Sequence, residues 1–215
     1  MITVDFVMEN KVITIVRKLY GEKLLKLAQA LSEGGIRMIE CTFDQSDPDC
    51  IARTSEAISL LREKMGDKMH VGAGTVLDVE QVEAAYRAGA EFIIAPNVCP
   101  QVIKRTKELG MLSIPGAMTP TEILYAHELG ADFVKLFPAA TLGFKYIKDI
   151  KAPISHVKLI ATAGVTEENF GEFLDAGLVG AGISGRLTDK KLIEAGDWAE
   201  FTNRARVFSD IAKRG

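Results

Sequence analysis

The sequence lacks the features of a membrane-spanning, exported or nucleic-acid-binding protein. No apolar run in its 215 residues approaches the roughly 18 residues needed to cross a bilayer. The opening segment carries Asp5 and Glu9 where a signal peptide would carry basic charge, and it has no small-residue cleavage site. Lys and Arg number 26 against 29 Asp and Glu, and the two signs are interspersed. This near balance predicts no attraction to nucleic acid or to an anionic membrane.

Disulfide and metal-binding patterns are also missing. The three cysteines, Cys41, Cys50 and Cys99, form no CxxC pair, and their odd number favours a reducing compartment over a disulfide framework. The three histidines have no metal-ligand spacing, and no H-x-x-H motif occurs. We therefore expect a cytoplasmic protein that acts on a small molecule and uses no metal or other cofactor.

What the sequence does have is a regular alternation of short β-branched runs and longer amphipathic stretches. The amphipathic stretches predict helices, and the last of them predicts a closing helix at about 197–213. The short runs predict eight strands, at residues 11–17, 36–43, 70–76, 92–95, 111–115, 132–137, 157–162 and 178–184.

Glycines mark the same repeat. Gly66, Gly89, Gly110 and Gly130 follow one another at intervals of 20 to 23 residues, and Gly177 lies about two further units along. Each follows a helical pattern and precedes a predicted strand, which is the usual place for the left-handed stop of a helix. We therefore interpret these glycines as structural and not as a ligand signal.

Alternating strands and helices require a parallel sheet. Eight units without a long break predict a single α/β domain over residues 1–215, closed into a (β/α)8 barrel of the TIM type. An open doubly wound sheet is the alternative. Its first strand-to-helix turn would carry a glycine fingerprint, whereas residues 18–23 read KLYGEK, with one glycine.

Lys135 stands inside the apolar run DFVKLFP, which we expect to be buried on both faces. Burial would lower the pKa of its ammonium, and a neutral amine could attack a ketone to form a Schiff base. A lysine at a strand end that reaches water or pairs with an acid fits the position equally well. The residue is therefore a candidate nucleophile with an open structural alternative.

Glu40 is the second charge inside an apolar strand. Alternation along the strand places it on one face with Met38 and Thr42. If that face points inward, Glu40 on the second strand faces Lys135 on the sixth, and its carboxylate could act as a general acid and base. A structural ion pair with Lys135 or Arg17 is the alternative.

Three further places could hold an anion. Arg17 ends the first strand, where a guanidinium could clamp a carboxylate or lie in solvent, and Thr75 ends the third beside two glycines. The loops after the seventh and eighth strands are where barrels commonly bind phosphate. Thr162, Gly164 and Ser184 are the candidates there, although helix–strand packing explains the glycines of those loops about as well.

Taken together, the motifs resemble those of the 2-keto-3-deoxy-6-phosphogluconate (KDPG) and 4-hydroxy-2-oxoglutarate (KHG) aldolases, a class I aldolase family on the (β/α)8 barrel. The resemblance runs from about residue 10 to residue 187, with the motifs in the family's order. It rests on residues 15–17 (IVR), 34–36 (GGI), 39–42 (IECT), 71–76 (VGAGTV), 115–122 (PGAMTPTE) and 134–139 (VKLFPA).

The resemblance implies a role for each candidate. Lys135 matches the Schiff-base lysine, and Glu40 matches the acid/base glutamate. The expected substrate-binding residues are Arg17 and Thr75 for the pyruvate carboxylate, Pro96 on a turn lining the site, and Thr162, Ala163, Gly164 and Ser184 for phosphate. The implied reaction cleaves a 2-keto-4-hydroxy acid to pyruvate and an aldehyde, glyceraldehyde 3-phosphate or glyoxylate. The implied assembly is a homotrimer without metal.

Two positions depart from the family pattern. Asp44 stands where many members have an arginine that helps to bind the distal phosphate, and a carboxylate pointing inward there would repel that group. Thr162, Ala163 and Gly164 replace Thr-Gly-Gly, which adds a methyl group. Both changes leave the imine chemistry intact. The alternatives are another phosphate-binding barrel, such as an epimerase or decarboxylase, and a barrel that binds a metabolite without turning it over.

Overall fold

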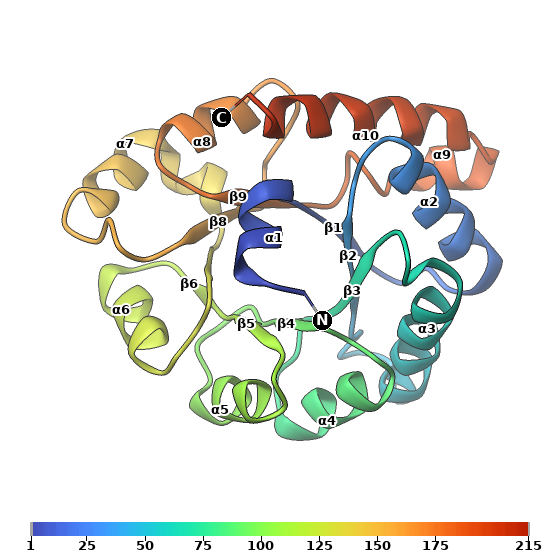
Figure 1. The fold of residues 1–215 in the computed structure, drawn as a ribbon, viewed down its shortest axis with the longest axis horizontal. Helices are drawn as coiled ribbons and strands as arrows, with labels where there is room; N and C mark the ends of the chain where they lie inside the picture. The colour runs from blue at the N-terminus through green and yellow to red at the C-terminus, as the bar shows by residue number, and fades with distance from the viewer. Residues whose placement is uncertain (1, 215) are drawn as a thin grey trace.

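Short strands and helices alternate along the computed structural model, which describes residues 2–214 and arranges the strands as a ring inside a layer of helices (Figure 1). The strands are β1 (Val12–Val16), β2 (Met38–Thr42), β3 (His70–Gly74), β4 (Phe92–Ile94), β5 (Leu112–Ile114), β6 (Gly116–Ala117), β7 (Val134–Leu136), β8 (Leu159–Thr162) and β9 (Gly180–Ile183).

The helices follow the strands around the outside of the ring, apart from α1. They are α1 (Val4–Asn10), α2 (Gly21–Glu33), α3 (Cys50–Met65), α4 (Val79–Arg87), α5 (Pro100–Glu108), α6 (Pro120–Glu128), α7 (Ala139–Lys151), α8 (Phe170–Asp175), α9 (Lys190–Ala195) and α10 (Trp198–Ala212). Helix α10 occupies the region predicted for the closing helix and packs against α2. No helix within residues 2–214 is both long and apolar enough to cross a membrane.

The strands form one parallel sheet in the order β5-β4-β3-β2-β1-β9-β8-β7-β6. β5 and β6 together occupy one strand position of the barrel. They are separated by Pro115, which has no N–H to donate to the sheet. Backbone bonds close the ring, because Phe133 N–H donates to Ser113 O (3.3 Å) and Lys135 N–H donates to Pro115 O (2.8 Å). The predicted eight-unit barrel is confirmed, and its fifth strand region extends to Ala117.

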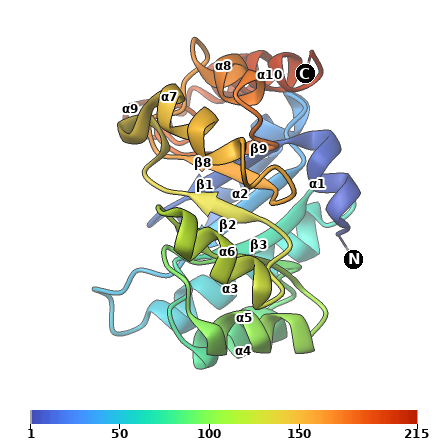
Figure 2. The same cartoon turned by 90° about the vertical axis from the view of Figure 1, so that its left-hand side faces the viewer.

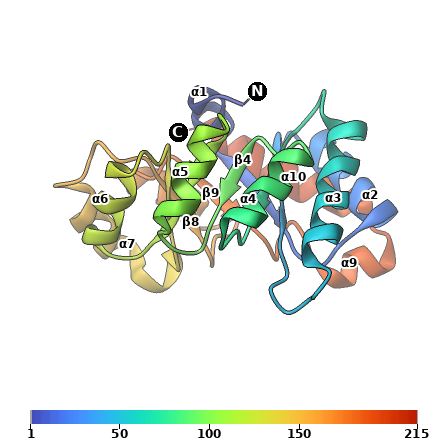
Figure 3. The same cartoon turned by 90° about the horizontal axis from the view of Figure 1, so that it is seen from below.

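Two apolar cores result from the alternation of side chains along each strand. One lies between the strands and the outer helices. The other fills the barrel and includes Ile13, Met38, Phe92 and Phe133. Val7 joins this inner core from α1, which lies over the middle of the ring in Figure 1 and opposite the loop after β2 in Figures 2 and 3. Helix α1 therefore closes the N-terminal end of the barrel, and the C-terminal ends of the strands carry the opposite face.

The repeated glycines follow the ends of helices as predicted, but Gly66 lacks the left-handed conformation. Gly89, Gly110, Gly130 and Gly177 have φ between 76° and 94°, in the left-handed region. Gly66 has φ −65°. The chain beyond α3 turns without a left-handed residue, because the N–H groups of residues 68 and 69 both donate to the carbonyl of residue 65 at 2.8 Å.

Candidate active site

Glu40 and Lys135 both lie inside the barrel, on the faces that the alternation predicts. Only 1% of Glu40 and 5% of Lys135 is exposed, although each carries an ionisable group. Gly74 pairs with Thr42 on the neighbouring strand, and a Cβ atom at Gly74 would overlap the Glu40 carboxyl group. The glycine of β3 therefore provides the space that the carboxyl group occupies.

Burial shifts the pKa of both groups toward neutrality. Desolvation raises the pKa of Glu40 to about 7, and the positive charges of Lys135 and Arg17 offset only part of this effect. Desolvation also lowers the pKa of Lys135, with Glu40 opposing the shift and Arg17 adding to it. Glu40 Oε2 has no hydrogen-bond partner among the described residues. Burial thus favours the neutral amine of Lys135, which is the nucleophilic form, and leaves Glu40 able to accept and donate a proton near pH 7.

Arg17 and Thr75 meet above this pair. They follow β1 and β3, the two strands that flank β2, and Arg17 Nη1 donates a hydrogen bond to Thr75 Oγ1 at 3.3 Å. The guanidinium retains N–H groups with which to bind a carboxylate. The structure thus brings together the two residues expected to hold the keto-acid end of a substrate.

Two glutamines that the sequence analysis did not single out hold the Thr75 turn. Gln45 Nε2 donates to the carbonyl of Thr75 at 2.8 Å, and Gln81 Nε2 donates to Gln45 Oε1 at 3.0 Å. Gln81 Oε1 also accepts from the N–H of Leu77 at 2.8 Å. Thr75 has φ 56°, a conformation that is costly for a β-branched residue and that needs such support.

Ala163 is a second residue with a left-handed backbone at this end of the barrel. Its φ is 73°, and it is followed by Gly164 with φ 77°. The loop after β8 therefore keeps a conformation that suits glycine, with an alanine in the first place. The methyl group noted in the sequence is accommodated at a backbone cost of about 1 kcal/mol.

A cavity of about 410 Å³ opens at the C-terminal ends of the strands. It is lined by six of the predicted residues: Arg17, Lys135, Thr162, Ala163, Gly164 and Ser184. Phe137 and Arg186 also line it, and the sequence analysis did not single out either of them. The Lys135 ammonium lies 4.9 Å from the centre of the Phe137 ring. The cavity therefore joins the lysine to the two loops expected to bind phosphate.

Glu40, Thr75 and Pro96 lie outside the lining of this cavity. Glu40 is connected to it electrostatically through Lys135 and Arg17, and Thr75 is connected through its hydrogen bond to Arg17. The carbonyl of Pro96 packs against Gly116 of β6, where a Cβ atom would overlap it. Gly116 of β6 is paired with Lys135 of β7, so Pro96 supports the strand that lies beside Lys135.

Asp44 is engaged by its own neighbours. Its carboxylate contacts Lys18 Nζ at 2.7 Å and accepts hydrogen bonds from the hydroxyl (2.7 Å) and the N–H (3.2 Å) of Ser46. These hydrogen bonds, from Lys18 first and then Ser46, lower the pKa of Asp44 to about 2. The carboxylate is ionised and paired, and it is not part of the cavity lining.

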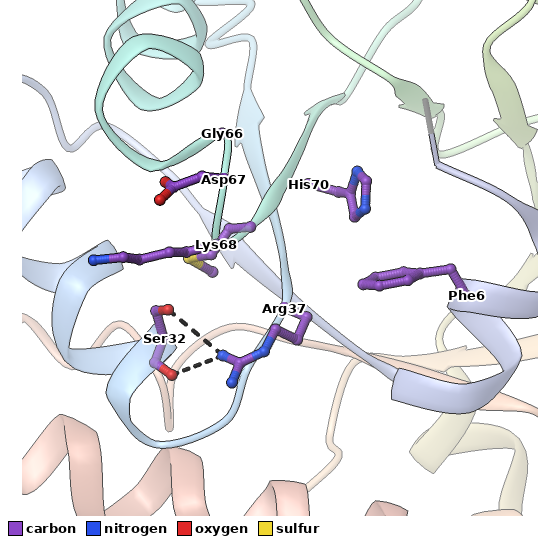
Figure 4. Close-up of a pocket in the computed structure, with 8 residues that line it drawn as sticks. Phe6, Ser32, Arg37, Gly66, Asp67, Lys68 and His70 are labelled. Carbon is purple, nitrogen blue, oxygen red and sulfur yellow. Dashed lines mark hydrogen bonds between the residues drawn. The ribbon is translucent and has the colours of Figure 1, made fainter.

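Another cavity of about 410 Å³ lies at the N-terminal end of the barrel (Figure 4). Arg37 lies there, but its Nη1 is already hydrogen-bonded to the carbonyl of Ser32 at 2.7 Å. The reactive residues of barrels lie at the C-terminal ends of the strands. Size alone does not separate the two cavities, but the buried Lys135 identifies the C-terminal one as the candidate active site. Residues 2–214 contain no group of three or more metal-ligating side chains.

The site combines a buried lysine of lowered pKa with a carboxyl group that exchanges protons, at the C-terminal end of a parallel barrel. This combination is typical of enzymes that form imines with carbonyl substrates. Comparison with known proteins identifies one group within this class. The family described as KDPG and KHG aldolase matches residues 4–204, and the chain belongs to this family. It is therefore a lyase, an aldolase by family.

Individual relatives agree with this assignment. The chain is 36% identical to 2-dehydro-3-deoxy-6-phosphogalactonate aldolase of Escherichia coli (strain K12) over 176 residues, 81% of this chain and 83% of that protein. It is 32% identical to 2-dehydro-3-deoxy-phosphogluconate aldolase of Haemophilus influenzae, over 95% and 94% of the two chains. The KDPG aldolase of Legionella pneumophila, with pyruvate captured as a covalent carbinolamine, superposes with a TM-score of 0.84 at 26% identity, over 96% and 98%.

Proposed function

We propose that this protein is a Schiff-base aldolase that cleaves a 2-keto-3-deoxy-6-phospho sugar acid, such as KDPG, or the related KHG, to pyruvate and an aldehyde. The observation that carries the proposal is the burial of Lys135 beside Glu40 at the C-terminal end of the barrel. The pyruvate carbinolamine of the Legionella relative and the names of the other relatives support the same chemistry.

The reaction begins at the lysine. The neutral Nζ of Lys135 attacks the C2 carbonyl carbon of the substrate, giving a carbinolamine that loses water to form an iminium. Glu40 accepts the proton of the C4 hydroxyl through a water molecule. The C3–C4 bond then breaks, its electron pair moves toward the iminium nitrogen, and the aldehyde leaves. Protonation of the resulting enamine at C3 and hydrolysis of the iminium release pyruvate and restore the amine.

The remaining residues orient the substrate. Arg17 and Thr75 bind the carboxylate of the keto acid, which fixes the face of the ketone that Lys135 attacks. Thr162, Ala163, Gly164 and Ser184 bind a distal phosphate, and Pro96 supports the wall beside Lys135. By resemblance to the family, the proposal includes a cytoplasmic homotrimer in which residues 1–215 act as one catalytic domain without metal.

Pyruvate release from KDPG and from KHG, measured in parallel, tests this function. We expect catalytic turnover of at least one of the two, unaffected by EDTA. Binding of both compounds without pyruvate release would contradict the proposal and favour a metabolite-binding barrel. Loss of activity with EDTA would point to a metal-dependent aldolase.

A further inference from the structure

Arg186 and Glu167 form a clamp across the rim of the catalytic cavity. Arg186 lies in the loop after β9, and Glu167 lies in the loop after β8. Arg186 Nε donates to Glu167 Oε2 at 2.8 Å, and Arg186 Nη2 donates to Glu167 Oε1 at 3.0 Å. Only 15% of the Glu167 side chain is exposed, so the guanidinium is held on one edge by a largely buried carboxylate.

The opposite edge of the guanidinium is available to a ligand. A guanidinium has five N–H groups, and the bidentate contact with Glu167 uses the single one on Nε and one of the two on Nη2. Nη1 has no hydrogen-bond acceptor among residues 2–214. The arginine lines the cavity beside Ser184 and Gly164. The free N–H groups of Nη1 and Nη2 lie along one edge of the guanidinium, and such an edge can bind two phosphate oxygens in a bidentate manner.

The other cations near the site do not take the position of Arg186. Arg17 and Lys135 lie at the keto-acid end of the proposed substrate, and Lys18 is not among the residues that line the cavity. Glu167 is engaged by Arg186, and Glu168 and Asp189 lie near enough to raise the pKa of Arg186 further, after Glu167. Arg186 is therefore a fixed, permanently charged group that lines the cavity from the loop after β9, together with other residues of that loop and of the loop after β8.

We propose that Arg186 binds the distal phosphate of the substrate and sets the preference for phosphorylated over non-phosphorylated 2-keto acids. Glu167 is a positioning residue that keeps the guanidinium over the cavity. This inference rests on the proposed aldolase function and names the substrate class of the same site.

The test compares two substrates in one variant. Arg186→Leu should lower kcat/KM for KDPG by about 10- to 100-fold, mainly through KM, because a charge-assisted contact to phosphate is lost. For the non-phosphorylated 2-keto-3-deoxygluconate the same variant should stay within about twofold of the wild type. Arg186→Lys should recover part of the loss, since lysine keeps the charge but not the bidentate edge. The matched control is Arg87→Leu, which removes an exposed, ion-paired arginine of α4 and should change neither substrate.

Two outcomes would overturn the inference: no loss with KDPG, or an equal loss with both substrates. Borohydride trapping of pyruvate on Lys135 separates this failure from failure of the proposed function. Pyruvate has no phosphate, so the Arg186→Leu variant should trap it as the wild type does. A wild-type protein that traps no pyruvate would refute the aldolase proposal itself, whatever the Arg186 variants show.

Discussion

Gly74 on β3 lies against the carboxyl group of Glu40 on β2, so closely that any side chain at position 74 would overlap that group. Gly74→Ala is expected to displace the flexible end of Glu40 at a cost of about 1 kcal/mol of stability, the low end of the range for overpacking. Turnover should then fall at least about tenfold, because the acid/base group moves from its working position. Steady-state kinetics and thermal unfolding of the variant measure the two effects.

Gly72→Ala on the same strand is the matched control. A methyl group there would overlap the ring of Phe92, to which its three nearest atoms all belong, and not the Glu40 carboxyl group. It should cost stability through overpacking, about 1 to 3 kcal/mol. If Gly74→Ala turned over substrate at the wild-type rate, the position of Glu40 would be irrelevant to catalysis.

Replacement of Glu40 by glutamine separates imine formation from bond cleavage. Glu40→Gln should still form the Schiff base with pyruvate, since Lys135 remains. Cleavage should slow by about 10²- to 10⁴-fold, the contribution typical of a positioned general acid or base. Trapped adduct and kcat are the two readouts, and full activity of this variant would remove Glu40 from the mechanism.

The raised pKa of Glu40 also predicts a pH-dependent cost in stability. Burial disfavours the ionised form, so the native state holds its proton up to about pH 7 and the unfolded state releases it near pH 4.5. Below pH 4.5 the carboxyl group is protonated in both states and does not change the stability with pH. As pH rises from 4.5 through 7, the free energy of unfolding falls. Glu40→Gln should therefore stabilise the protein by roughly 2 to 4 kcal/mol at pH 8 and by little at pH 4.5. Denaturant unfolding at both pH values checks this, and an equal effect at the two would contradict it.

The Arg17–Thr75 pair predicts selective recognition of carboxylates. Arg17→Leu should raise the KM for the keto acid by about 10- to 100-fold, because a charge-assisted contact is lost. Imine formation with hydroxyacetone, which has no carboxylate, should fall far less in the same variant, because Arg17 is only the last and smallest of the named influences on the pKa of Lys135. A similar loss with both ketones would show that Arg17 acts on Lys135 and not on the carboxylate.

Periodicity along the chain predicted much of this arrangement. Alternation of side chains placed Glu40 on one face with Met38 and Thr42, and the structure shows that this face points into the barrel. Eight apolar runs were enough to predict the barrel. Helix α1 was not predicted, because its seven residues are too few for a periodic pattern. The continuation of the fifth strand region as β6 was also missed, since the prediction ended that strand at Pro115 and a proline followed by a glycine is typical of a turn.

Contacts between loops were beyond the reach of the sequence. Gln45 and Gln81 are 36 residues apart, and Glu167 and Arg186 are 19 apart. The first pair joins the loop after β2 to the first turn of α4, and the second joins the loops after β8 and β9, segments that the barrel brings together only after the strands have paired. No local pattern of charge or hydropathy marks such residues, so the support of Thr75 and the clamp on Arg186 emerged only from the structure.

The most direct test of the account is reductive trapping of pyruvate. The protein is incubated with pyruvate and borohydride, digested, and mapped by mass spectrometry, with Lys135→Arg as the control. The account predicts that Lys135 gains the mass of a reduced pyruvate adduct and that the control variant gains none. An unmodified Lys135, or an adduct that persists at other lysines in the control, would contradict a Schiff base at this residue.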